Sequence, residues 1–135
     1  MTVYLLDTNT AVAAMRGTAG LDSRLQRMQS DEWCISAITH AEMRYGAALK
    51  PQAIQLQRYV DAFLAVARTE PWDAACAEFH GQVRAELRAK GHLLGDFDEM
   101  IAAHALALGA VLVTDNMRHF MRVEGLQLEN WIRAS

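Results

Sequence analysis

The sequence contains only two cysteines, two prolines and two lysines among 135 residues, and it has no long apolar run. It has no CxxC pair or compact set of cysteines and histidines, so nothing points to a structural zinc site. No apolar stretch approaches the ~20 residues that cross a bilayer, so no membrane-spanning helix is expected. The first residues carry no positive charge before Asp7 and do not read as a signal peptide. We therefore expect a cytoplasmic protein with two buried, unpaired thiols.

The formal net charge of −3 argues against a protein that binds nucleic acid by general electrostatic attraction. It does not exclude a nuclease, because an acidic site attracts phosphate once cations occupy it. The length is close to that of one domain, and 52% of the residues are hydrophobic, enough for a core. No repeat, low-complexity tract or linker interrupts the pattern. We expect a single domain over residues 1–135.

Short apolar runs alternate with helical patterns along the chain. The expected strands are residues 3–6, 33–36, 111–114 and 126–128, with an extended piece at 67–71. The expected helices are residues 8–15, 18–29, 39–49, 51–64, 73–90 and 96–108. Strands that are apolar throughout are typical of parallel sheets covered on both faces. The alternation therefore predicts an α/β fold.

Two helix starts are predicted from capping patterns. Thr39 and Glu42 have the spacing of a capping box. Asp96 is expected to be an N-cap with Glu99 as its partner three residues later. Such patterns explain these acids without any catalytic role.

Four acids nevertheless converge in the predicted fold. Asp7 and Asp115 follow predicted strands, while Glu42 and Asp98 lie in the first turns of helices, which start at the same edge of the sheet. Converging carboxylates raise one another's pKa, and divalent cations relieve their repulsion. Ligands that are all oxygen suit Mg²⁺ or Mn²⁺. Such a site fits phosphodiester hydrolysis, in which one cation activates water and a second stabilises the leaving oxygen.

Several stretches resemble, in order, the motifs of PIN-domain nucleases. They are Tyr-Leu-Leu-Asp-Thr-Asn at 4–9, Ile-Ser-Ala-Ile-Thr-His-Ala-Glu-Met-Arg-Tyr-Gly at 35–46, Gly-His-Leu-Leu-Gly-Asp-Phe-Asp-Glu-Met-Ile-Ala-Ala-His-Ala at 91–105, Val-Leu-Val-Thr-Asp-Asn at 111–116 and the ending at 125–131. Within this family the VapC toxins of bacterial toxin–antitoxin pairs are the most similar group. The resemblance implies a PIN-like three-layer α/β domain, with a short parallel sheet flanked by helices. It also implies RNA cleavage dependent on Mg²⁺ or Mn²⁺, a VapB-type antitoxin, and a homodimer that forms a larger assembly with the antitoxin.

The resemblance assigns Asp7 and Asp98 as metal ligands, with Glu42 completing the set directly or through water. The wider family pattern Thr-x-Asp puts a fourth acid at 116, where this chain has Asn116 beside Asp115. Either Asp115 takes the catalytic role, or Asn116 holds a water and the site has three acids. The number of metal ions therefore stays open. Side chains expected to support the acids by hydrogen bonds are Thr8, Asn9, Thr114 and Asn116.

Other residues near these motifs have two interpretations. His104 lies in an apolar helix and is expected to be packed and hydrogen-bonded rather than a base. Arg118 and His119 either touch substrate phosphate or are solvated loop residues. Arg84, on one helix with Arg88 and Lys90, either guides RNA or belongs to an exposed basic face.

Other functions fit less well. A phosphoacceptor receiver domain needs adjacent acids after its first strand and a lysine after a late strand, whereas the only lysines are Lys50 and Lys90. A haloacid-dehalogenase phosphatase needs an acid two residues after Asp7, where Asn9 stands. Two alternatives stay open: a catalytically inactive PIN-like module that binds RNA or protein, and cleavage of DNA by the same chemistry.

Overall fold

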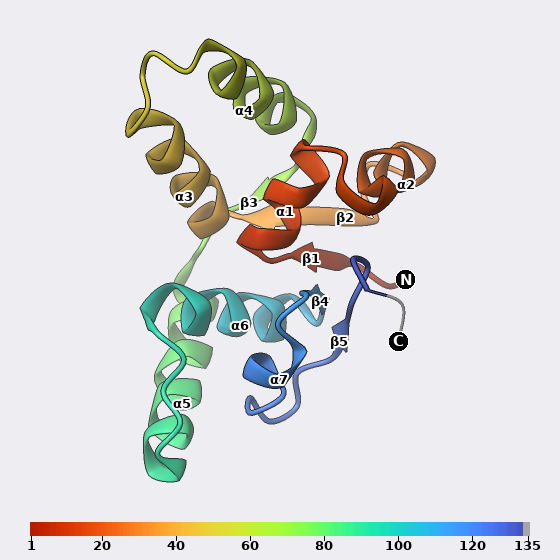
Figure 1. The fold of residues 1–135 in the computed structure, drawn as a ribbon. Helices are drawn as coiled ribbons and strands as arrows, with labels where there is room; N and C mark the ends of the chain where they lie inside the picture. The colour runs from red at the N-terminus through yellow and green to blue at the C-terminus, as the bar shows by residue number, and fades with distance from the viewer. Residues whose placement is uncertain (134–135) are drawn as a thin grey trace.

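The computed structural model describes residues 1–133 and has a five-stranded parallel sheet with helices on both faces (Figure 1). The strands lie in the order β3-β2-β1-β4-β5. Their bounds are β1 Tyr4–Leu6, β2 Trp33–Ser36, β3 Thr69–Glu70, β4 Val111–Val113 and β5 Leu128–Glu129. Leu6 at the end of the central strand is in register with Ile35 on one side and Val113 on the other. The predicted parallel α/β fold is confirmed.

The two faces of the sheet carry separate cores because successive strand residues point to opposite sides. Leu5, Cys34 and Leu112 face one side, and Leu6, Ile35 and Val113 face the other. The first side is covered by α5 (Ala74–Lys90), α6 (Asp96–Leu108) and α7 (Met117–Phe120). The second is covered by α1 (Thr8–Met15), α2 (Leu21–Arg27), α3 (Ala37–Ala48) and α4 (Ile54–Val66). Figure 1 shows these two helical layers above and below the sheet.

The helix that carries Glu42 begins earlier than its capping pattern predicts. Ser36, not Thr39, is the N-cap of α3, and its hydroxyl accepts a hydrogen bond from the Ile38 N–H at 3.0 Å. Ser36 is the last, extended residue of β2, so the chain passes from strand to helix without a loop. Thr39 is buried inside the helix, with its Oγ1 3.0 Å from that of Thr8. The predicted capping box is therefore wrong.

The N-cap or the first residue of other helices also differs from the prediction. Gly95, not Asp96, is the N-cap of α6, with φ 105°, a conformation that favours glycine. Helix α4 begins at Ile54, because residues 51–52 form a turn. The segment expected as one helix over 18–29 is a 3₁₀ turn over Thr18–Gly20 followed by the shorter α2.

The strand order reverses beside β1. The chain adds β2 and β3 on one side of β1, and later adds β4 and β5 on the other. Ligands of open α/β sheets bind at such a reversal, at the carboxyl ends of the strands. Asp7 follows β1 and its N–H donates to the Val113 carbonyl of β4 at 3.0 Å. The reversal thus brings the start of the chain against its last third.

Both cysteines are buried and unpaired, as predicted. Burial raises the pKa of the Cys34 thiol to about 11 and also raises that of Cys76. Within residues 1–133, none of the helices has the length and apolar character needed to span a membrane.

Candidate active site

A largely polar pocket of about 250 Å³ lies at the carboxyl edge of the sheet. Its lining residues come from the β1–α1 junction, from α3, from α6, and from the start and end of α7. They are Asp7, Thr8, Asn9, Glu42, Asp98, Asn116 and Phe120. Three of the four predicted acids thus line one pocket, together with Asn9 and Asn116.

Asp7 is the most deeply buried of the three acids, with 4% of its surface exposed. Its Oδ1 accepts a hydrogen bond from the Thr10 N–H at 2.9 Å, so Asp7 is the N-cap of α1. Burial raises the pKa of Asp7, and hydrogen bonds from Thr114 and Thr10 oppose this. The charge of Asp98 raises the pKa further. Asp7 is therefore held at a fixed point with a charge that its surroundings disfavour.

Glu42 is joined to α1 through a hydroxyl. The Thr8 Oγ1 donates to Glu42 Oε1 at 2.6 Å. Burial raises the pKa of Glu42, and the nearby charges of Asp98 and Asp7 raise it too. The Thr8 hydrogen bond works in the opposite direction. Thr8 therefore holds Glu42 on the pocket side of α3.

Asp98 lies in the first turn of α6, where the helix dipole favours an acid. Its Oδ2 is 3.1 Å from Nε2 of His119, on the short helix α7. The His119 ring in turn packs edge-on against Phe120, with ring centroids 5.3 Å apart. His119 is thus in contact with a pocket acid and is not a solvated loop residue.

The fourth motif turns Asn116, rather than Asp115, into the pocket. The Thr114 hydroxyl accepts a hydrogen bond from the Asn116 N–H at 2.9 Å and so shapes a tight turn after β4. Asp115 does not line the pocket. Its Oδ1 accepts from Asn130 at 3.0 Å and pairs with Arg133 at 3.0 Å. The positions favour the three-acid alternative, and the expected catalytic role of Asp115 does not fit where its side chain lies.

This difference can be tested by substituting Asp115 and Asn116 one at a time. For the metal-dependent RNA cleavage that the sequence predicts, Asp115→Asn is expected to change the rate by less than about threefold, because Asp115 contacts Asn130 and Arg133 and does not line the pocket. Asn116→Ala is expected to lower that rate by about 10–100-fold, the usual effect of removing a group that supports a metal site. Initial rates of both purified variants, with melting temperatures as a check on folding, decide the matter. A loss in Asp115→Asn as large as in Asp7→Asn would return the fourth acidic role to Asp115.

Sequence reasoning did not single out Phe120, although it lines the pocket and is 1% exposed. The available signal was its place as an apolar residue between the polar pair Arg118-His119 and the next turn. His104, by contrast, behaves as predicted. It is buried, and its Nδ1 is 2.8 Å from the hydroxyl of Ser36.

The chemistry of the lining suits a hard divalent cation. Three carboxylates, two amides and a hydroxyl offer oxygen donors of the kind that Mg²⁺ and Mn²⁺ prefer. As the side chains stand, no three His, Cys, Asp or Glu groups in the described chain close around one point. Glu42 instead binds Thr8, and Asp98 contacts His119. The chemistry of the donor set therefore fits the cation.

Comparisons with known proteins agree with the geometry. The PIN domain profile matches residues 4–126. The tRNA(fMet)-specific endonuclease VapC of Shigella flexneri is 34% identical over 131 residues, which cover 97% of this chain and 99% of that protein. Ribonuclease VapC2 of Rickettsia felis is 36% identical, covering 96% and 98%.

Solved structures give the same result. VapBC2 from Rickettsia felis, bound to a DNA fragment from its promoter, superimposes with a TM-score of 0.88 at 35% identity, covering 96% of this chain and 99% of that one. DNA-bound VapBC from Salmonella typhimurium gives a TM-score of 0.89 at 35% identity, covering 97% and 99%.

Proposed function

Because the chain belongs to the PIN-domain family, within its VapC group of toxin ribonucleases, we propose that it is an endoribonuclease that cleaves RNA with Mg²⁺ or Mn²⁺ held by Asp7, Glu42 and Asp98. The observation that carries the proposal is the meeting of these three acids in one pocket at the strand-order reversal. Burial and mutual charge raise the pKa of two of them, Asp7 and Glu42. Such carboxylates favour a bound cation that offsets their charge.

The residues of the pocket have separate tasks in this proposal. Asp7, at the end of a central strand, provides the least movable carboxylate, and Asp98 provides a second from the opposite helical layer. Thr8 orients Glu42, and the Asn116 amide is placed to hold water or a phosphate oxygen. When bound, the cation supplies an acidified water as nucleophile and positive charge for the leaving oxygen.

RNA is the proposed substrate because the relatives are ribonucleases. The Shigella relative carries initiator tRNA in its name, which makes that tRNA the first defined substrate to test. Specific recognition of RNA mostly reads unpaired loops, whose backbone can enter a small pocket. A single-stranded DNA with the sequence of a cleaved RNA loop tests whether the protein cleaves RNA and not DNA.

The direct test uses purified protein freed of antitoxin and incubated with labelled total RNA, initiator tRNA and single-stranded DNA. We expect discrete RNA fragments with Mg²⁺ or Mn²⁺, none with EDTA, and recovery when the cation is restored. Intact RNA under every condition, from protein shown to be folded, would instead support an inactive module that only binds RNA or protein. Cleavage unaffected by EDTA would refute the metal-dependent mechanism.

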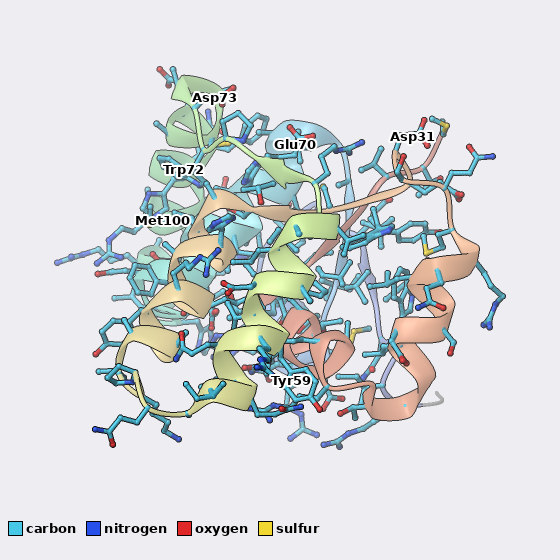
Figure 2. The ribbon with its side chains drawn as sticks, turned by 90° about the horizontal axis from the view of Figure 1, so that it is seen from above. Asp31, Tyr59, Glu70, Trp72, Asp73 and Met100 are labelled. Atoms are coloured by element: carbon cyan, nitrogen blue, oxygen red, sulfur yellow. The ribbon has the colours of Figure 1, made fainter. Side chains whose placement is uncertain are left out.

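We also propose that a VapB-type antitoxin binds this chain, since similar solved structures are VapBC complexes. A largely apolar groove of about 400 Å³ between α1, α2 and α4 offers it a surface. Val66 at the rim is 74% exposed, and Tyr59, on the side of α4 that faces α1 and α2 in Figure 2, is 41% exposed. An amphipathic helix binds such grooves through its apolar face. A homodimer, and a larger assembly with antitoxin, are proposed on family grounds alone.

Charged substitutions in the groove test this placement. Val66→Glu and Tyr59→Glu together are expected to weaken antitoxin binding at least about tenfold, because each puts a charge against an apolar helix face. Both side chains are substantially exposed, so folding should persist. Phe79→Glu on α5, also exposed, is the matched control on the other face. Calorimetric titration and light scattering report affinity and assembly. Wild-type affinity in the double variant would place the antitoxin elsewhere.

A further inference from the structure

We propose that the ion pair between Arg84 and Glu99 positions Asp98 and thereby sets the affinity of the acidic pocket for a divalent cation. This inference rests on the metal-dependent function proposed above. Glu99 is a positioning residue in this view, because it does not line the pocket itself. It acts through the neighbouring residue of α6.

Glu99 is a fully buried carboxylate with both oxygens bonded. Its side chain is 0% exposed. Oε1 accepts a hydrogen bond from Arg84 Nη1 at 2.7 Å, and Oε2 accepts one from the Leu94 N–H at 3.0 Å. A buried carboxylate without such partners would be strongly destabilising. Its conformation is therefore fixed by α5 on one side and by the segment before α6 on the other.

These contacts lie at the start of α6. Gly95 is the N-cap and has no side chain to receive the first N–H groups of the helix. Glu99 reaches back across this turn to Leu94 and ties the preceding segment to the helix. The same Arg84 nitrogen also contacts Asp96 Oδ1 at 2.9 Å. Arg84 thus contacts Asp96 and Glu99, which precede and follow Asp98 in the first turn of α6.

A second anchor lies one residue further along α6. The indole Nε1 of Trp72 donates to the Met100 carbonyl at 2.9 Å, and Figure 2 shows the two residues side by side. The Trp72 ring also meets the His80 ring edge-on, and His80 Nε2 is 3.8 Å from Glu99 Oε1. The segment before α5 and the first turns of α5 therefore hold the start of α6 together.

In this proposal the ion pair fixes the position of Asp98 and adds little to the free energy of unfolding. Replacing a buried ion pair with apolar residues of similar size is often neutral or stabilising. The orientation of groups behind metal ligands, however, commonly changes metal affinity by about 10–100-fold. Arg84, for which the sequence left open a role in guiding RNA, is 43% exposed and uses Nη1 to bind Glu99 and Asp96.

The test uses the full chain, freed of antitoxin, and measures Mn²⁺ binding by calorimetry together with melting temperature. Arg84→Met/Glu99→Met removes the charges as a pair. Glu99→Gln keeps the shape but has one acceptor oxygen, so it can accept from Arg84 or from the Leu94 N–H but not from both. Both are expected to raise the Kd for Mn²⁺ by about 10–100-fold. Cleavage should return toward the wild-type kcat as Mn²⁺ is raised. Asp61→Asn, which breaks the exposed Arg44–Asp61 pair of 2.6 Å, is the control and should leave the Kd unchanged.

The possible outcomes separate the two proposals. Wild-type Kd values in folded Glu99→Gln and in the double variant would overturn the positioning role and leave the metal-dependent function standing. Failure of the wild-type protein itself to bind Mn²⁺ would overturn the metal-dependent function, and this inference with it. Should the double variant not fold, Glu99→Gln alone decides, because it loses only one hydrogen bond.

Discussion

Replacing Asp7 with asparagine is expected to lower RNA cleavage by about 10³-fold or more without disturbing the fold. Loss of a metal ligand removes several kcal/mol of transition-state stabilisation, and each 1.36 kcal/mol is about tenfold in rate. Asparagine is as good an N-cap as aspartate and can accept the same hydrogen bond from Thr10. Initial rates with RNA in excess Mg²⁺ provide the measurement.

A matched control comes from the opposite edge of the sheet. Asp31 is exposed and lies just before the amino end of β2, whereas the pocket lies at the carboxyl ends of the strands. Asp31→Asn changes the net charge of the protein by the same amount as Asp7→Asn does. Because Asp31 lies away from the pocket, this variant should cleave RNA like the wild type. Full activity in a folded Asp7→Asn variant would overturn the site assignment.

For Asp7→Asn we also expect the melting temperature to depend on pH differently from that of the wild type. Burial raises the pKa of Asp7, so the folded state binds its proton more tightly than the unfolded state does. The neutral carboxyl therefore favours folding below the ordinary pKa, and this contribution is lost as pH rises through the folded value. In EDTA, Asp7→Asn should melt higher than wild type near pH 7, by about 2–5 °C. The gap should close toward about pH 4. A gap that does not depend on pH would contradict the burial argument.

The second large effect is expected from Phe120→Ala. This side chain is 1% exposed, among the largest fully buried side chains, and it supports His119 beside Asp98. Its removal should cost about 3–5 kcal/mol of unfolding free energy and also reduce cleavage, because α7 then holds His119 less firmly. Met121→Ala is the control on the next residue, which is 69% exposed, and should stay within about 0.5 kcal/mol. Equal midpoints for the two variants in urea would contradict the stabilising role of Phe120, and equal cleavage rates would show that it does not support the site.

The fold and the shared edge of the acids were predictable because they depend on local pattern. Apolar runs such as Val111–Val113 mark buried parallel strands, and the carboxyl ends of parallel strands meet at one edge. Asp7 and Asp98 could therefore be placed together from sequence, although they are 91 positions apart. The resemblance to known motifs added the identity of the chemistry.

The details that the sequence did not predict depend on the tertiary structure. Ser36 and Thr39 are both good caps, and the point where β2 ends selects Ser36. The Thr114 hydroxyl shapes the turn that brings Asn116, not Asp115, to the pocket. The partner of Arg84 is a carboxylate 15 positions away on another helix, which no local spacing indicates.

The strand order also has a consequence for the timing of synthesis. Because β4 pairs with β1, Asp7 and Asn116 become neighbours only after the ribosome has made the chain as far as residue 116. Pairing across such a long separation is also slow compared with local helix formation. An emerging chain that already carries Asp7 and Glu42 therefore lacks the other half of its pocket. The topology thus delays assembly of the pocket until β4 and Asn116 have been synthesised.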